Sequence, residues 1–413
     1  MRPNLVAATV VLLAAVASCT GAGSDDAKTG DTPSSSSTSS PSATSSTTSA
    51  PTTATDGATS TPTPTPDAAE RALATMSLAQ RVGQLVMVGT PATGTGGTAR
   101  AAISEQHVGN VMLTGRSTRG VAGTAATTAA LQRKATSRAT GGVRLFVATD
   151  QEGGDVQVLS GSGFSQIPTG TTQGGWSAAQ LQARAETWGR QLRRAGVDVT
   201  LGPVADTVPA SLGTANPPIG RFHRELGHTP SAVSRAVVAY DAGMRDAGIA
   251  VVPKHFPGLG LVRANTDTAS RVTDSVTTAS SPSLQPFRAA VDAGAPFVMI
   301  SNAAYPRIDA AHPACFSRAV ITTLLRGTLG FDGVVISDDL GAAGAVQRWS
   351  PGSRAVQFVA AGGDVVLTVT PALAAPMARA LVAKAKQSKG FRDQVDAAAL
   401  RVLRAKDDAG LLP

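Results

Sequence analysis

The stretch Ile249-Ala250-Val251-Val252-Pro253-Lys254-His255-Phe256-Pro257-Gly258 joins a short apolar run to a charged pair. The run from Ile249 to Val252 has the length and composition of a parallel strand that is buried on both faces. Lys254 and His255 stand at its end, where a buried lysine is unfavourable unless it is paired. The stretch therefore predicts a core strand whose end carries a site for a polar ligand.

Seven other apolar segments of similar length are spread along the chain, with Ala-rich helical segments between them. The predicted strands are 85–89, 110–114, 144–149, 197–202, 249–253, 297–301, 333–337 and 364–369. The predicted helices include 178–195, 231–247, 284–293, 317–329 and 351–361. This alternation indicates parallel βαβ units. Eight units predict an α/β domain over residues 67–413 that forms a single (β/α)8 TIM-type barrel.

The start of the chain differs from this domain. Residues 1–18 are predicted to be a signal peptide, because Arg2 precedes an apolar segment too short to span a bilayer. Val16-Ala17-Ser18-Cys19 resembles the lipobox of bacterial lipoproteins, which implies lipidation of Cys19 and anchoring on the extracytoplasmic face of the cell membrane. The alternative is an ordinary cleaved signal with an unrelated cysteine. Residues 19–66 are nearly all Ser, Thr, Pro, Gly, Ala and Asp, which predicts a disordered tether.

The predicted domain is basic. The chain has a net charge of +8, and residues 1–67 contribute two basic residues and five aspartates, so the remainder carries +11. One interpretation is attraction to anionic lipid or cell-wall polymer, and the other is solubility alone. Arg193-Arg194 is the only basic cluster and aromatic residues are few, so nucleic acid is not expected as a partner.

Several other classes of site are not expected. The five histidines show no compact ligand spacing, which argues against a metal site. No Gly-x-Ser-x-Gly motif marks a serine hydrolase. We expect a protein that works without a cofactor and as a monomer.

Polar residues collect where the predicted strands end. They are Asp150-Gln151-Glu152, the segment 203–206, Lys254-His255, Asn302 and Asp338-Asp339. Active sites of barrels lie at this end of the strands. Carboxylates facing each other across such a mouth, with basic residues between them, fit the cleavage and binding of sugars.

Three motifs give a more specific resemblance, which covers the chain from about Asp67 to its end. Asp150 to Gly154, Lys254 to Gly258 and Leu329 to Leu340 resemble motifs of glycoside hydrolase family 3. Within that family, the single-domain β-N-acetylglucosaminidases are the most similar type. The resemblance implies a retaining exo-enzyme that hydrolyses terminal N-acetylglucosamine from peptidoglycan fragments during cell-wall turnover.

The same resemblance implies roles for particular residues. Asp338 takes the place of the nucleophile, and its strand parity with Val334 and Ile336 supports an inward orientation. Asp150, Lys254, His255 and Arg224 take the places of sugar ligands. For the last of these, Arg221 is a competitor, because this segment is about two residues longer than in the family.

One segment departs from the family pattern. Family members of this type carry an Asp-His dyad on a mobile loop as general acid and base, but here Asn265, Thr266 and Asp267 stand in its place. In one hypothesis Asp267 is itself the proton donor, with a pKa raised by Asp338 and by loop closure. In the other, the protein binds wall fragments with little or no turnover. A family 3 β-glucosidase or β-xylosidase is a further alternative.

Overall fold

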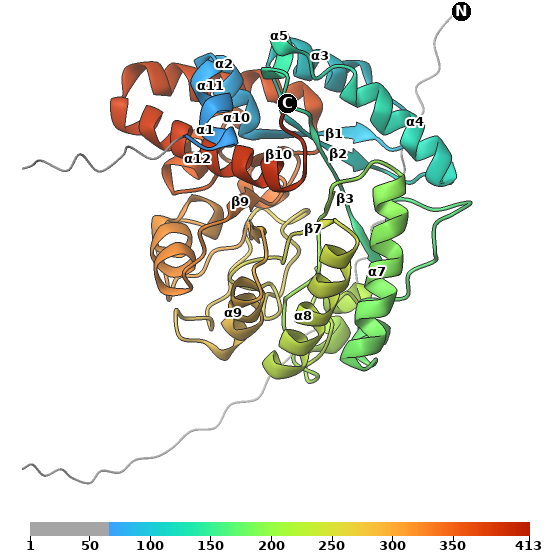
Figure 1. Cartoon of the computed structure of the whole chain (residues 1–413). Helices are drawn as coiled ribbons and strands as arrows, with labels where there is room; N and C mark the ends of the chain where they lie inside the picture. Colours follow the sequence, from blue (N-terminus) through green and yellow to red (C-terminus); the bar gives the residue numbers. More distant parts are fainter. Residues whose placement is uncertain (1–65) are drawn as a thin grey trace, which may run out of the picture. The chain divides into compact units, whose positions relative to one another are not determined.

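Eight parallel strands alternate with helices along the chain (Figure 1). The computed structural model describes residues 66–413, which fall within one compact unit. The predicted signal peptide, Cys19 and the tether up to residue 65 lie outside the described residues. No helix among the described residues is both long and apolar enough to cross a membrane.

All eight predicted strands are present. Their bounds are β1 Val86–Pro91, β2 Asn110–Thr114, β3 Phe146–Thr149, β6 Val199–Thr200, β7 Ala250–Val251, β8 Phe297–Ile300, β9 Val334–Ser337 and β10 Val366–Thr368. A parallel sheet has the order β10-β1-β2-β3-β6-β7, and β8 pairs with β9 in a second parallel sheet. A short antiparallel hairpin of β4 (Gln151–Gly153) and β5 (Val156–Gln157) follows β3 and was not predicted.

The predicted α/β class with parallel strands is confirmed, but the single closed ladder of a barrel is not. The two sheets are joined by isolated bridges, Phe256 to Ile300 and Ile336 to Val365, and by a few backbone hydrogen bonds beside them. Side chains replace part of the missing ladder: the N–H of Val335 donates to Asp364 at 2.7 Å, and the N–H of Leu367 donates to Ser337 at 2.9 Å. Competition by these side-chain acceptors interrupts the backbone pairing between β9 and β10.

Helices cover the outside of the strands (Figure 1). Their bounds are α1 Ala68–Thr75, α2 Leu78–Gln84, α3 Gly97–Glu105, α4 Gly120–Gln132, α5 Ser137–Thr140, α6 Gly170–Gly174, α7 Ala178–Arg194, α8 Pro230–Asp246, α9 Gln285–Asp292, α10 Pro351–Ala360, α11 Ala374–Gln387 and α12 Lys389–Asp408. Four of the five predicted helices are α-helices within one or two residues of the expected bounds. The segment predicted as 317–329 is instead a π-helix, Ala319–Thr328.

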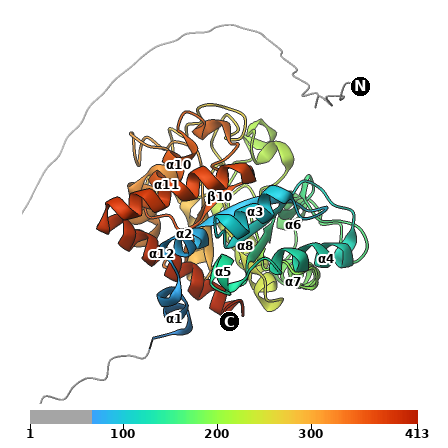
Figure 2. The ribbon, with the colours of Figure 1, turned by 90° about the horizontal axis from the view of Figure 1, so that it is seen from above.

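Local sequence sets the helix starts. Ser177 and Gln180 form a capping box at α7, in which the Ser177 hydroxyl accepts from the Gln180 N–H and the Gln180 side chain accepts from the Ser177 N–H. The first and last helices lie side by side, with α1 against α12 (Figure 2). Arg404 of α12 donates to Asp67 at 2.9 Å and to Glu70 at 3.0 Å.

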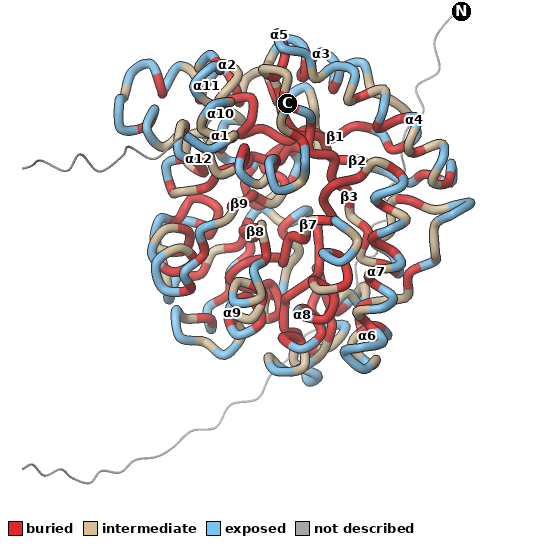
Figure 3. Tube along the Cα trace, in the orientation of Figure 1, coloured by how far each residue is buried: buried red, intermediate tan, exposed pale blue. Residues whose placement is uncertain are grey.

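The space enclosed by the strands is apolar. Side chains from all eight strands or their ends meet there: Met87, Met112, Phe146, Val199, Val252, Phe297, Val334 and Leu367. Figure 3 shows the strands as the most continuously buried part of the chain. At the N-terminal ends of the strands, the buried Lys406 ammonium donates to Gln84 and to the carbonyls of Gly109 and Arg144. Lys406 therefore closes this end of the space between the strands.

Candidate active site

A cavity of about 400 Å³ lies at the C-terminal ends of the strands. All six residues predicted to bind or cleave a sugar line this cavity: Asp150, Arg224, Lys254, His255, Asp267 and Asp338. They come from four different loops, which follow β3, β6, β7 and β9. The structure thus brings together the residues that the motifs had placed up to about 190 positions apart in sequence.

Lys254 is held by two carboxylates. Its Nζ lies 2.6 Å from Oδ1 of Asp150 and 2.7 Å from Oε1 of Glu152, and its side chain is 3% exposed. Burial opposes the charged form, but the two carboxylates outweigh it and raise the pKa of Lys254. The lysine is therefore a permanent cation in the wall of the cavity.

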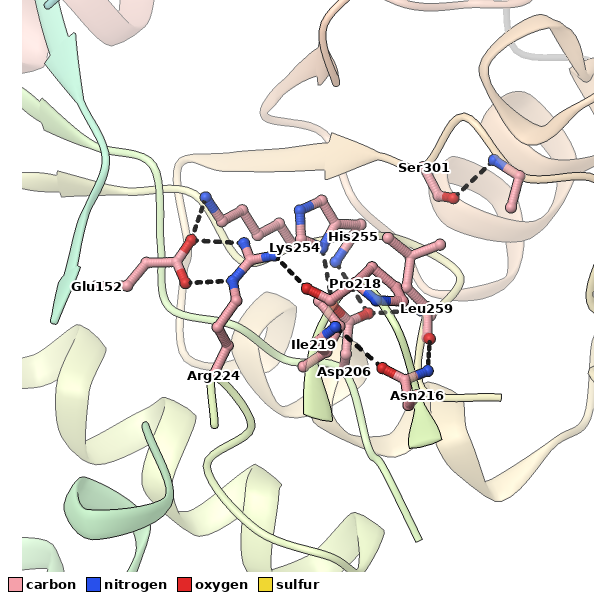
Figure 4. A network of polar contacts seen from close by, with 12 residues as sticks. Glu152, Asp206, Asn216, Pro218, Ile219, Arg224, Lys254, His255, Leu259 and Ser301 are labelled. Carbon is pink, nitrogen blue, oxygen red and sulfur yellow. Dashed lines mark hydrogen bonds and ion pairs between the residues drawn. The ribbon is translucent and has the colours of Figure 1, made fainter. Parts of the chain in front are cut away.

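Glu152 also binds Arg224 (Figure 4). The guanidinium donates to both carboxylate oxygens, at 2.8 Å from Nε and 2.7 Å from Nη2, and it also donates to the carbonyl of Pro218 at 2.8 Å. Burial acts to raise the pKa of Glu152, yet Arg224 and Lys254 together lower it to about 2. Arg224 thus has the position of a cavity ligand, whereas its competitor Arg221 is exposed and does not line the cavity.

His255 is oriented by Asp206 (Figure 4). Its Nδ1 lies 2.8 Å from Oδ2 of Asp206, and Oδ1 accepts the backbone N–H groups of His255 and Leu259 at 3.1 and 2.7 Å. A carboxylate can only accept, so Nδ1 carries a proton, and Nε2 is the ring nitrogen that can accept a hydrogen bond whenever the ring holds a single proton.

Asp338 follows β9 and is anchored through its backbone. Its N–H donates to the carbonyl of Ile300 at 3.0 Å, and its Oδ1 accepts from the N–H of Asp339 at 2.7 Å. Burial raises the pKa of Asp338 to about 6; His255 opposes the rise and Asp267 adds to it. Asp338 is thus ionised at neutral pH with little stabilisation, which suits a nucleophile.

Asp339 has a different environment. Its two oxygens accept from the N–H groups of Gly341, Ala342 and Val369 at 2.8 to 2.9 Å. These bonds shape the loop after β9. The Asp339 side chain therefore stabilises this loop, although it also lines the cavity.

Asp267 lies on the loop that departs from the family pattern. Its side chain is exposed, its N–H donates to Oδ1 of Asn265 at 2.9 Å, and its carbonyl accepts from the N–H of Gly344 at 2.9 Å. The loop therefore presents the Asp267 carboxylate to the cavity without enclosing it.

Two residues of the site were not singled out from the sequence. Glu152 and Asp206 were seen only as polar residues after strands, yet Glu152 joins Lys254 to Arg224 and Asp206 fixes His255. The one available signal was the pair of predicted sugar ligands Lys254 and Arg224, whose two positive charges exceed the single negative charge of Asp150. No group of three or more metal-ligating side chains occurs within residues 66–413.

The cavity of this parallel α/β domain contains carboxylates without a cationic partner and charged side chains that can bind hydroxyl groups. These features are typical of a glycoside hydrolase. Residues 77–405 match the family described as "Glycosyl hydrolase family 3 N terminal domain", and the chain belongs to this family.

Known relatives agree with this assignment. The chain is similar to a crystal structure of a β-N-acetylhexosaminidase from Beutenbergia cavernae, with 53% identity, a TM-score of 0.80, and coverage of 80% of this chain and 99% of that one. A family 3 β-N-acetylglucosaminidase from Paenibacillus is 30% identical, with a TM-score of 0.73 and coverage of 81% of this chain and 63% of that one. A β-hexosaminidase from Stenotrophomonas maltophilia is 37% identical over 239 residues, which are 55% of this chain and 68% of the relative.

Proposed function

We propose that the protein is a retaining exo-β-N-acetylglucosaminidase. One observation carries the proposal: among the four carboxylates that line the cavity, only Asp338 and Asp267 lack both a cationic partner and a full set of N–H donors within the described residues. Cleavage of a glycosidic bond with retention needs two such carboxyl groups, one as nucleophile and one as acid and base.

The roles follow from the surroundings of each group. Asp338 attacks the anomeric carbon and forms a covalent glycosyl ester, while Asp267 donates a proton to the leaving oxygen. Asp267, now ionised, then takes a proton from the water that hydrolyses the ester. Asp150, Lys254, Arg224 and His255 bind the hydroxyl groups of the sugar and hold the anomeric carbon at Asp338.

The substrate proposal is terminal N-acetylglucosamine on peptidoglycan fragments. It is supported by relatives that are named β-hexosaminidase and β-N-acetylhexosaminidase. The test compares 4-nitrophenyl glycosides of N-acetylglucosamine, glucose and xylose. Preferential release from the N-acetylglucosaminide, lost in Asp338→Asn and kept in the exposed control Asp246→Asn, supports the proposal. Preference for glucose or xylose contradicts it.

A binding protein with little turnover is the second candidate. The exposed position of Asp267 favours it, because the structure leaves this carboxyl group open to water and does not enclose it in the cavity. Tight binding of N-acetylglucosamine without chromophore release decides for this candidate, and measurable turnover that depends on Asp267 decides against it.

We also propose that the chain is exported and anchored through Cys19, a role supported by the leader and by the lipobox-like segment. Replacement Cys19→Ser is expected to move the protein from the membrane fraction to the soluble fraction. Unchanged membrane association contradicts lipidation at this residue.

A further inference from the structure

Four arginines surround a hollow at the end of the domain opposite the active site. The hollow has a volume of about 560 Å³, and Arg133, Arg144, Arg193 and Arg194 line it; we call it the basic hollow. Arg133 follows α4, Arg193 and Arg194 end α7, and Arg144 precedes β3. All four therefore lie at the N-terminal ends of the strands.

The positive charge of the basic hollow is not neutralised. Asp198 is the only carboxylate among its lining residues; it is buried and binds Arg193 at 3.1 Å and the N–H of Val147 at 3.1 Å. Arg133, Arg144 and Arg194 are exposed, and their guanidinium groups form no ion pair or hydrogen bond within residues 66–413. Asp407 and Asp408, at the end of α12, are exposed but do not line the hollow.

Helix electrostatics explain only part of this arrangement. Basic residues in the last turn of a helix are favoured by its partial negative charge, which accounts for Arg193 and Arg194. Arg144 belongs to no helix, and its N–H is bonded to the carbonyl of Leu411. Its convergence with the other three arginines points to an anionic partner with several phosphate groups, because guanidinium groups bind phosphate oxygens in pairs.

The start of the domain lies at the same end. Ala69, at the start of α1, and Met76, directly after it, pack in one cluster with Val143, the residue before Arg144. The chain thus enters the domain beside the basic hollow, while the cavity with Asp338 opens at the other end. A charged surface that met the basic hollow would leave the cavity accessible.

From these observations we propose that the basic hollow docks the domain on the anionic headgroups of a phospholipid bilayer. The docking needs no lipid chain on the protein and is independent of the reaction that the cavity catalyses. Each arginine near an anionic surface contributes a similar amount to the free energy of binding, and salt weakens this contribution.

The test measures sedimentation of residues 66–413 with vesicles. This part of the chain is suitable because its match covers 99% of the Beutenbergia cavernae structure. That structure therefore consists of the equivalent domain. We expect binding to vesicles that contain phosphatidylglycerol, no binding to phosphatidylcholine alone, and release at high salt. The triple variant Arg133→Gln, Arg144→Gln, Arg194→Gln is expected to bind about 100-fold more weakly.

The matched control removes three exposed arginines from other parts of the surface, Arg100→Gln, Arg235→Gln and Arg307→Gln, and is expected to stay within about threefold of the parent. Equal binding of the two triple variants overturns the proposal, as does failure to bind phosphatidylglycerol. Release by free glycerol 3-phosphate at constant ionic strength also overturns it, in favour of a soluble phosphate ligand. The single variants Arg144→Gln and Arg194→Gln, each expected to weaken binding about fivefold, serve if the triple variant does not fold.

Discussion

Lys254 and Glu152 form a buried ion pair, with Nζ and Oε1 2.7 Å apart and side chains that are 3% and 7% exposed. Glu152 also pairs with Arg224, so Glu152 and Asp150 together balance two cations in the cavity wall. Binding of the sugar therefore depends on Glu152, a residue that need not touch the sugar.

Replacement Glu152→Gln should destabilise the fold. Because its neighbours lower the pKa of Glu152 from 4.5 to about 2, the ionised group contributes about 3 kcal/mol above pH 4.5, a contribution lost as the pH falls towards 2. Urea unfolding at pH 7 should show a loss of that order in the variant, and its stability should fall less steeply in acid. Glu105→Gln, at an exposed glutamate, is the control; an equally small effect of both changes contradicts this role.

Replacement Asp206→Asn should reverse the tautomer of His255. An amide N–H facing Nδ1 forces that atom to accept, which moves the ring proton to Nε2 on the cavity side. We expect kcat/KM to fall about 100-fold with the fold intact. Nitrogen NMR shifts of the His255 ring report the tautomer directly, and an unchanged tautomer would refute the explanation.

The acidic limb of the pH profile should belong to Asp338. The nucleophile must be ionised, and its pKa of about 6 predicts that kcat/KM falls tenfold per pH unit below that value. A limb centred near the ordinary carboxyl pKa of about 4 contradicts this assignment.

Loss of the proton donor should depend on the leaving group. Asp267→Asn is expected to slow hydrolysis of alkyl N-acetylglucosaminides by about 10² to 10⁴, because their leaving oxygen needs a proton. The 4-nitrophenyl glycoside, whose leaving group is a stable anion, should be affected far less. Equal losses on both substrates exclude Asp267 as the acid.

The sequence predicted the strands well because their residues are continuously apolar, and the six predicted site residues could be placed together because they follow those strands. The prediction of a closed ladder was wrong. Between β9 and β10, Asp364 and Ser337 accept backbone N–H groups, which the pattern of apolar residues does not reveal. Asp206 was missed as a partner of His255 for a similar reason. A hydrogen bond between loops 49 positions apart has no periodicity in the sequence.

The most direct test of the account is the covalent intermediate. A 5-fluoro N-acetylglucosaminyl fluoride reacts with a retaining enzyme to give a glycosyl ester that is hydrolysed slowly, and mass spectrometry of peptides then locates the label. The account predicts one labelled peptide, with the sugar on Asp338. A label on Asp339 or Asp267, or turnover of the fluoride without any labelled peptide, would contradict it.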